Sequence, residues 1–459
     1  MLYYFLVTII QKEQGRQETF MAGNIVLAAV ICVLAFIIAY FYIPRNKHRL
    51  VFALIIFTAV LVRFFTVFYI YRNGTDTFGT DGLLYHREGI EIMNQLASGA
   101  RLGDIKYSYT LYTAFIGLLY YFAGANRYLA SYINIIFAFV SGLILLKIAL
   151  NHRYSMLNSI LISACFLYFP NLVLWTADTR KEAFLILICF LCWLSVQKLI
   201  LTLDKKSCRL SNILRVIFIC LMMWVGTLIR IYIFVPFLLG IITSLAVLYR
   251  KSRQKVCLAY AAAVFAGAVI ILITVLYPMT TDYHAVSFPK EQSDNVVKDV
   301  NNKVDTIYDI VAKRNILKSI ANCLLLPNPA DMNISDISFS NKVQLVVKVD
   351  MIVWYICLLL ILTGIYSAFK TQDSYFLGLL SFIAVYILIN AFIAESVADT
   401  VYRYRSAIVG LTILFIDGRV IKRLFLLLGM LLNGKAGNRM QPYTKYEVLS
   451  LLQNRKNFL

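Results

Sequence analysis

The chain has 459 residues, of which 60% are hydrophobic and 15% are charged, and its formal net charge is +20. This composition excludes a single soluble core, because many apolar runs reach the roughly 20 residues that cross about 30 Å of hydrocarbon. The runs do not alternate with polar residues, so an outer-membrane β-barrel is excluded as well. The positive charge does not indicate nucleic-acid binding, since the lysines and arginines collect in short loops, as they do on the cytoplasmic side of membrane proteins.

About eleven apolar runs predict an all-α polytopic membrane protein. We expect the spans near residues 22–43, 50–71, 128–148, 156–175, 183–203, 213–229, 231–249, 256–277, 346–368, 375–394 and 402–417. Basic loops such as 45–49, 205–215 and 250–255 are assigned to the cytoplasm. The protein is therefore expected to be a multi-pass protein of the cell membrane, with the bacterial plasma membrane favoured.

The runs also divide the chain into regions. We expect an N-terminal extension at 1–21, a transmembrane module at 22–277 with an outer loop at 72–127, an extracytoplasmic loop or lid at 278–345, C-terminal transmembrane helices at 346–418 and a cytoplasmic tail at 419–459. The polar loop 278–345 has too little apolar content for an independent domain, which favours a lid over a membrane cavity.

The outer loop 72–127 presents a parity problem. Three apolar segments lie between two cytoplasmic loops, and three crossings cannot return the chain to the same side. Segment 107–123 is short and rich in tyrosine, which prefers the headgroup level of the membrane. Segment 83–97 is amphipathic at helical spacing. We therefore predict two interfacial helices in this loop.

Asp81 is the leading candidate for a catalytic residue. A carboxylate in a partly desolvated cleft at the outer surface can act as a general base on an incoming hydroxyl or amine. The alternative is that Asp81 only caps the helix that follows it. Asp76 is a weaker second acid, and His86 is a further candidate unless it belongs to the solvated face of the surface helix.

A second polar cluster lies between two apolar runs on the same side of the membrane. It consists of Asp178, Arg180, Lys181 and Glu182. Cations on the outer side run against the positive-inside rule, so they favour an anionic partner such as a phosphate. An ordinary charged turn is the alternative.

Further cations stand close to or within apolar runs. Arg230 has almost no loop around it and needs a counter-charge. Arg403 and Arg405 alternate with tyrosines, a pattern that suits a phosphate and a sugar, although snorkelling to lipid headgroups is the alternative. Arg63 lies inside an apolar run and is expected to face the bundle, without an assigned role.

Motifs for other chemistries are absent from the sequence. It contains no glycine-rich phosphate loop, no metal-ligand cluster with usable spacing and no nucleophile elbow. An ATP-driven machine is therefore not indicated, and the substrate must already be activated.

An ordered set of short motifs points to a known family. It comprises Asp81 before Tyr85-His86-Arg87, then Phe122–Arg127, Tyr128–Asn134, Asp178–Glu182 after Tyr168-Phe169-Pro170, and Arg403-Tyr404-Arg405. The set resembles the GT-C superfamily, and within it the bacterial glycosyltransferase family 39-like membrane proteins. The chain departs from that family at Asp81-Gly82, where many members carry Asp-Glu, and at Ser108-Tyr109-Thr110, where they carry Pro-Pro.

The resemblance implies an inverting glycosyltransferase that uses a polyprenyl-phosphate-linked sugar at the extracytoplasmic face. The acceptor would be a glycan, a lipid or a protein, within surface-polysaccharide or lipid-glycan assembly. Asp81 would be the general base, and Glu182 would orient a cation or the sugar. The cations implied to bind the lipid phosphate are Lys106, Arg180, Lys181, Arg230, Arg403 and Arg405. The resemblance gives no certain cofactor and leaves a divalent cation open.

Two other functions stay open. An O-antigen-type polymerase or ligase also joins lipid-linked glycans outside the cell, but usually concentrates its arginines and a histidine in one late loop. A transporter or flippase of lipid-linked glycans would need charges at mid-membrane, and the sequence offers few beyond Arg63.

Overall fold

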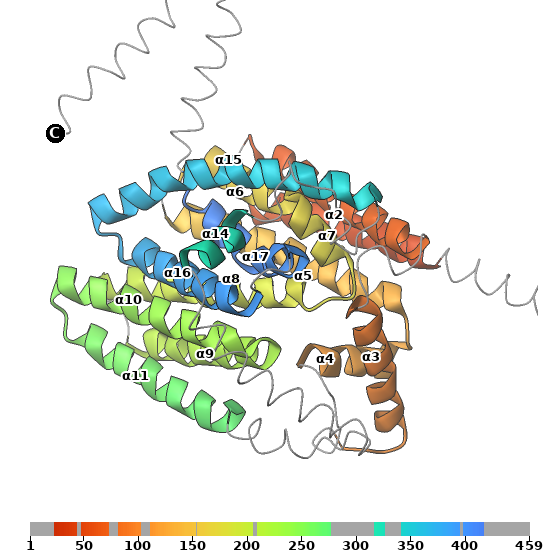
Figure 1. The fold of residues 1–459 in the computed structure, drawn as a ribbon, viewed down its shortest axis with the longest axis horizontal. Helices are drawn as coiled ribbons and strands as arrows, with labels where there is room; N and C mark the ends of the chain where they lie inside the picture. Colours follow the sequence, from red (N-terminus) through yellow and green to blue (C-terminus); the bar gives the residue numbers. More distant parts are fainter. Residues whose placement is uncertain are drawn as a thin grey trace, which may run out of the picture.

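A computed structural model describes residues 23–43, 47–72, 81–101, 111–152, 154–204, 209–276, 316–325, 341–394 and 398–416. The regular elements within these ranges are helices (Figure 1). They are Gly23–Tyr42, α2 (Arg49–Arg72), α3 (Asp81–Ala97), α4 (Leu111–Ala123), α5 (Arg127–Asn151), α6 (Met156–Tyr168), α7 (Pro170–Ala177), α8 (Glu182–Asp204), α9 (Arg209–Ile229), η2 (Ile231–Ile233), α10 (Phe234–Ser252), α11 (Val256–Ile271), η3 (Leu272–Leu276), α14 (Ile316–Leu325), α15 (Asn341–Thr371), α16 (Ser374–Ala394) and α17 (Ala398–Ile413).

The helix lengths confirm an all-α polytopic membrane protein. Among the described residues, nine helices are long and apolar enough to cross a membrane, and the number rises to ten if α6 and α7 form one span bent by 56°. The apolar runs of the sequence predict about eleven spans. The difference is the run expected at 402–417, which here forms the 16-residue helix α17. The C-terminal half of α17 is buried inside the bundle.

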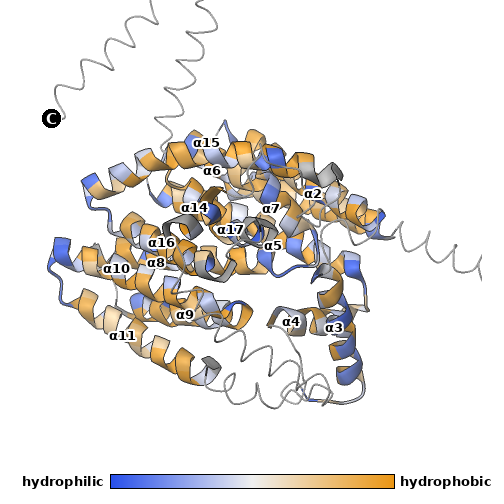
Figure 2. Cartoon of the chain, in the orientation of Figure 1, coloured by the Kyte–Doolittle hydropathy of each residue, from blue (hydrophilic) through white to orange (hydrophobic). Residues whose placement is uncertain are grey.

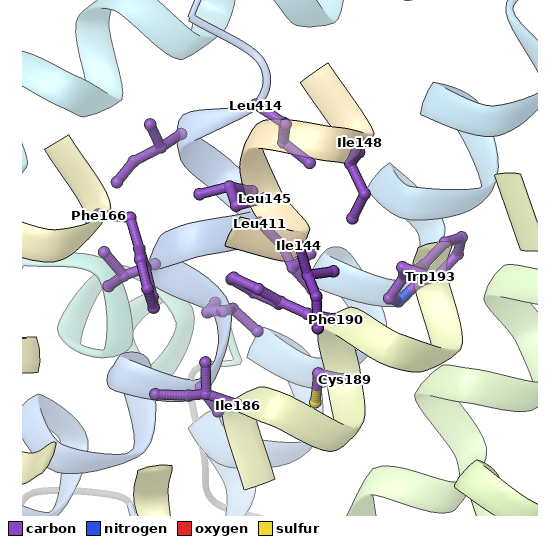
Figure 3. Close-up of a cluster of buried hydrophobic side chains, with 14 of the residues drawn as sticks. Ile144, Leu145, Ile148, Phe166, Ile186, Cys189, Phe190, Trp193, Leu411 and Leu414 are labelled. Atoms are coloured by element: carbon purple, nitrogen blue, oxygen red, sulfur yellow. The ribbon is translucent and has the colours of Figure 1, made fainter. Parts of the chain in front are cut away.

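A cluster of buried apolar side chains joins α5, α6, α8 and α17 (Figure 3). Phe190 of α8 lies there beside Ile144 of α5 and Leu411 of α17, whereas Trp193 of α8 packs against Phe382 of α16. At the periphery, large apolar side chains are exposed along α9 and α15, as expected for helices that face lipid chains (Figure 2). Packing inside and lipid contact outside together account for the high apolar content.

Helices α3 and α4 form a separate pair at one end of the bundle. The axis of α3 runs across the long helices rather than along them, and α3 is the most polar helix in view (Figures 1 and 2). The two helices pack through Tyr85 and Tyr112, whose rings make an edge contact at 5.5 Å. Helix α4 has 13 residues and is too short to span the membrane. This arrangement agrees with two interfacial helices and removes the parity problem.

Several of the predicted regions lie outside the described residues. They include the extension 1–21, the cytoplasmic tail 419–459 and most of the extracytoplasmic loop 278–345. The described part of that loop includes α14, which packs beside α16 and α17. Trp354 of α15 donates a hydrogen bond of 2.8 Å to the carbonyl of Leu324 in α14. The end of α14 is therefore attached to the membrane bundle.

Candidate active site

Five of the predicted site residues lie together at the α3 end of the bundle. Asp81 is the first residue of α3, Glu182 is the first residue of α8, and Lys181 directly precedes α8. Arg230 stands at the break between α9 and η2, where its φ of −148° interrupts the helix. Arg403 belongs to the first half of α17. Four separate parts of the chain thus supply one group of charges.

Glu182 is the centre of this group. Its carboxylate accepts a hydrogen bond of 2.6 Å from Arg230 Nη2 and a second one from Arg403 Nε. Arg403 also forms an ion pair with Asp81 through Nη1, so its guanidinium bridges two acids. Glu182 is 1% exposed and Arg230 is 5% exposed. Charges buried to this degree need partners, and each supplies the counter-charge of the other.

A cavity of about 380 Å³ opens beside the bridged acids. Its lining includes Asp81, Leu84, Tyr85, Lys181, Arg230, Tyr232, Arg403 and Tyr404. Arg230 donates a hydrogen bond of 2.6 Å to Tyr232 Oη and lies 4.6 Å from the ring centroid of Tyr404. The cavity is therefore lined by charged groups and tyrosine rings that contact one another.

Lys181 is the cation in this cavity that has no ion pair or hydrogen bond within the described part of the chain. Its Nζ lies 5.9 Å from the ring centroid of Tyr85. Burial, together with the positive charges of Arg230 and Arg403, lowers the pKa of Lys181 to about 8, against the opposing effect of Glu182 and Asp81. Lys181 can therefore accept an anionic partner.

The charges around the cavity favour an anion. Among the described residues, three cations (Lys181, Arg230 and Arg403) and two carboxylates (Asp81 and Glu182) lie at the cavity, which leaves one positive charge among these five when Lys181 is protonated. In a partly desolvated site such a surplus attracts phosphate strongly.

A second charged group lies directly against the first. Asp178 pairs with Arg180 at 2.9 Å and with Arg127 at 3.2 Å, and the guanidinium of Arg180 stands over the Trp175 ring at 4.7 Å. A Cβ atom added to Gly82 would lie 2.5 Å from Asp178 Oδ2. This close approach gives a physical reason for glycine after Asp81, and it places Asp178 next to the start of α3.

Asn134 holds this second group in place, although the sequence analysis did not select it. Its Nδ2 lies 2.6 Å from the carbonyl oxygen of Asp178, 2.8 Å from that of Arg180 and 2.9 Å from Tyr112 Oη. Asn134 is fully buried in α5. An amide inside an apolar run is the signal that could have identified it, because buried polar groups in spans need partners.

Other predicted residues lie elsewhere. Arg405 donates to the carbonyl of Leu324 at 3.2 Å and to Met351 Sδ at 2.9 Å, so it faces α14 and α15. It diverges from Arg403 because residues two apart in a helix point in nearly opposite directions. His86 bonds Tyr120 Oη through Nδ1 at 2.8 Å, and burial together with Arg127 lowers its pKa.

Lys106 and Asp76 lie outside the described residues. Within the described ranges, no group of three or more histidine, cysteine, aspartate or glutamate residues is arranged to hold a metal ion. A divalent cation stays a prediction.

Comparison of the sequence with family models and with curated proteins finds no match. Among solved structures, the fold is similar to that of the archaeal oligosaccharyltransferase AglB from Archaeoglobus fulgidus, in complex with an inhibitory peptide and a dolichol-phosphate. The TM-score is 0.44 and the sequence identity is 11%. The match covers 86% of this chain and 54% of AglB, so the chain spans about half the length of that protein.

Proposed function

We propose that this protein is a membrane glycosyltransferase that moves a sugar from a polyprenyl-phosphate donor to an acceptor at the extracytoplasmic face. The observation that carries the proposal is the convergence of Asp81, Lys181, Glu182, Arg230 and Arg403 beside one cavity. The basic residues Arg250 and Lys251 lie at the opposite end of α10 from Arg230, which supports an outer location for the cavity.

The cations would bind the phosphate of the donor. Lys181 supplies a positive charge that is paired with no carboxylate among the described residues, and the guanidinium of Arg403 supplies directed N–H donors. Both would stabilise the charge that develops on the phosphate oxygen as the bond to the sugar breaks. Glu182 would keep Arg230 and Arg403 in place rather than contact the donor.

Asp81 would act as the general base. Its side chain is 37% exposed at the edge of the cavity, so an acceptor hydroxyl can reach it. The acceptor oxygen would attack the anomeric carbon while the phosphate leaves with the bonding electrons, and the hydroxyl proton would pass to Asp81. A single displacement of this kind inverts the anomeric centre.

The proposed acceptor is a glycan, lipid or protein of the cell envelope. The residues around the cavity come from four separate parts of the chain rather than from one late loop, which supports this reading over an O-antigen-type polymerase or ligase. The charges gather at one end of the bundle, which supports an enzyme over a flippase.

The phosphate site can be tested with the full chain in lipid nanodiscs and polyprenyl monophosphate as the probe. Lys181→Met is expected to weaken binding roughly 10- to 150-fold, because a charge-assisted hydrogen bond contributes about 1.5–3 kcal/mol. The control Lys198→Met removes an exposed lysine further along α8 and should bind as the wild type does. Equal binding by the wild type and Lys181→Met would refute the phosphate site.

The base is tested separately by Asp81→Asn. This variant should bind polyprenyl monophosphate yet lose glycan elongation in cells by roughly 100-fold or more, the usual contribution of a general base. Full elongation by Asp81→Asn, at wild-type expression, would remove Asp81 from the mechanism.

A further inference from the structure

The break between α6 and α7 separates the two partners of one backbone hydrogen bond. In a continuous helix, the carbonyl of Leu167 would accept a bond from the N–H of Asn171, four residues later. Here Phe169 adopts an extended conformation, Pro170 opens α7, and the two helices are bent by 56°. Both the carbonyl and the N–H therefore need other partners inside the membrane.

Arg63 of α2 takes the place of the missing donor. Its Nη1 donates to the carbonyl of Leu167 at 2.7 Å, and its Nε donates to Thr176 Oγ1, in the last turn of α7, at 2.9 Å. The side chain is 1% exposed. One guanidinium thus joins the end of α6 to the end of α7.

Asp350 of α15 takes the place of the missing acceptor. Its Oδ1 accepts the N–H of Asn171 at 2.8 Å, and the residue is fully buried. The charges of Arg63 and Asp350 also have the signs that the dipoles of α6 and α7 favour. A cation is favoured at the C-terminus of α6, and an anion is favoured at the N-terminus of α7.

Helix α7 leads directly into the candidate site. It ends at Ala177, and the next five residues include Asp178, Lys181 and Glu182. Helix α7 has only 8 residues and is not stable as an isolated helix. Its position therefore depends on its packing against α2, α5 and α15 and on the groups that hold its ends.

We propose that Arg63 and Asp350 are positioning residues that each complete one half of the broken hydrogen bond and thereby fix the loop that follows α7 beside the cavity. The inference rests on the proposed function only for its effect on sugar transfer. The positioning of the loop by Arg63 and Asp350 does not depend on which substrate binds.

The test measures the pKa of Lys181 by competitive labelling of amines at a series of pH values, with mass spectrometry at peptide level. In the wild type, labelling of Lys181 should show a midpoint near the value of about 8 set by its buried surroundings. Arg63→Met and Asp350→Leu should move this midpoint toward 10.5, the ordinary value, as the loop leaves the cavity. Binding of polyprenyl monophosphate should weaken in the same variants.

Conservative variants separate positioning from folding. Asp350→Asn keeps an acceptor for the N–H of Asn171 and should restore the wild-type midpoint, whereas Arg63→Lys cannot reach both acceptors and should restore it only in part. The control Leu379→Ala opens a gap in α16, away from α7, and should lower the melting temperature without moving the midpoint.

An unchanged midpoint in Arg63→Lys, Arg63→Met and Asp350→Leu would overturn the positioning role. If the midpoint moves as expected but the wild type does not bind polyprenyl monophosphate, the positioning role stands and the proposed function fails.

Discussion

Replacing Glu182 with glutamine removes the carboxylate on which two guanidinium groups converge while keeping the size of the side chain. Arg230 pairs with Glu182 at 2.6 Å, with side chains that are 3% and 1% exposed. Removing one partner of a buried ion pair destabilises a protein by about 3–5 kcal/mol. Arg403 keeps Asp81 as a second partner, whereas Arg230 retains only the hydroxyl of Tyr232 and ring contacts within the described residues. We therefore expect the loss of stability in Glu182→Gln to come mainly from the unpaired charge of Arg230.

The free energy of unfolding can be measured by titrating the purified protein from mild detergent into denaturing detergent and following helix content. Glu91→Gln is the matched control, because Glu91 is exposed on α3 and surface substitutions usually change stability by less than about 0.5 kcal/mol. Glu182→Gln should be less stable than this control by about 3 kcal/mol or more.

A double-mutant cycle sharpens the test. In the Arg230→Met background, Glu182→Gln should lower the free energy of unfolding much less than it does in the wild type. The guanidinium that needs the carboxylate is already absent from that background. Glu182→Gln should also lower the midpoint of Lys181 labelling below about 8, since the carboxylate raises the pKa of that lysine. If Glu182→Gln is as stable as Glu91→Gln, the buried charge network described here is wrong.

Three further predictions concern the same end of the bundle. The pKa of Lys181 is about 8, so the affinity for polyprenyl monophosphate should fall as the pH rises from 7 to 9. Lys181→Arg should abolish this fall, because arginine stays protonated over that range. A wild-type affinity independent of pH would contradict this prediction. Gly82→Ala should destabilise the protein by about 1–3 kcal/mol, because the new methyl group meets Asp178 Oδ2 at 2.5 Å; unchanged stability would mean that α3 sits further away. Single cysteines introduced at the exposed positions Ser98 and Ser155 should react with an impermeant thiol reagent from outside only at Ser98, and the reverse pattern would invert the topology.

Periodicity and charge predicted the features of the fold that depend on local sequence. The amphipathic segment 83–97 predicted α3, which begins two residues earlier at Asp81. The tyrosine-rich segment 107–123 predicted the short helix α4 (Leu111–Ala123). The loops also indicated which polar residues stand at the ends of spans on one side of the bundle. Four of those residues (Asp81, Lys181, Arg230 and Arg403) line one cavity, and Glu182 pairs with its two arginines; the catalytic roles stay predictions.

Contacts between distant parts of the chain could not be predicted in this way. Arg63 bonds a carbonyl 104 residues away, and Asn134 reaches the loop that follows α7 from another helix. Such contacts depend on how helices pack, and hydropathy alone carries no information about packing partners. The same holds for Arg405, whose neighbour Arg403 faces the cavity while Arg405 itself faces α14.

The contact between Gly82 and Asp178 has a consequence for the divergence of this protein. The carboxylate occupies the space that a side chain at position 82 would need. A homologue with a larger residue at position 82 should therefore carry a shorter one at position 178, or a displaced α3. In an alignment, these two columns should covary even though many residues separate them, and the paired exchange should be tolerated where either single exchange is not.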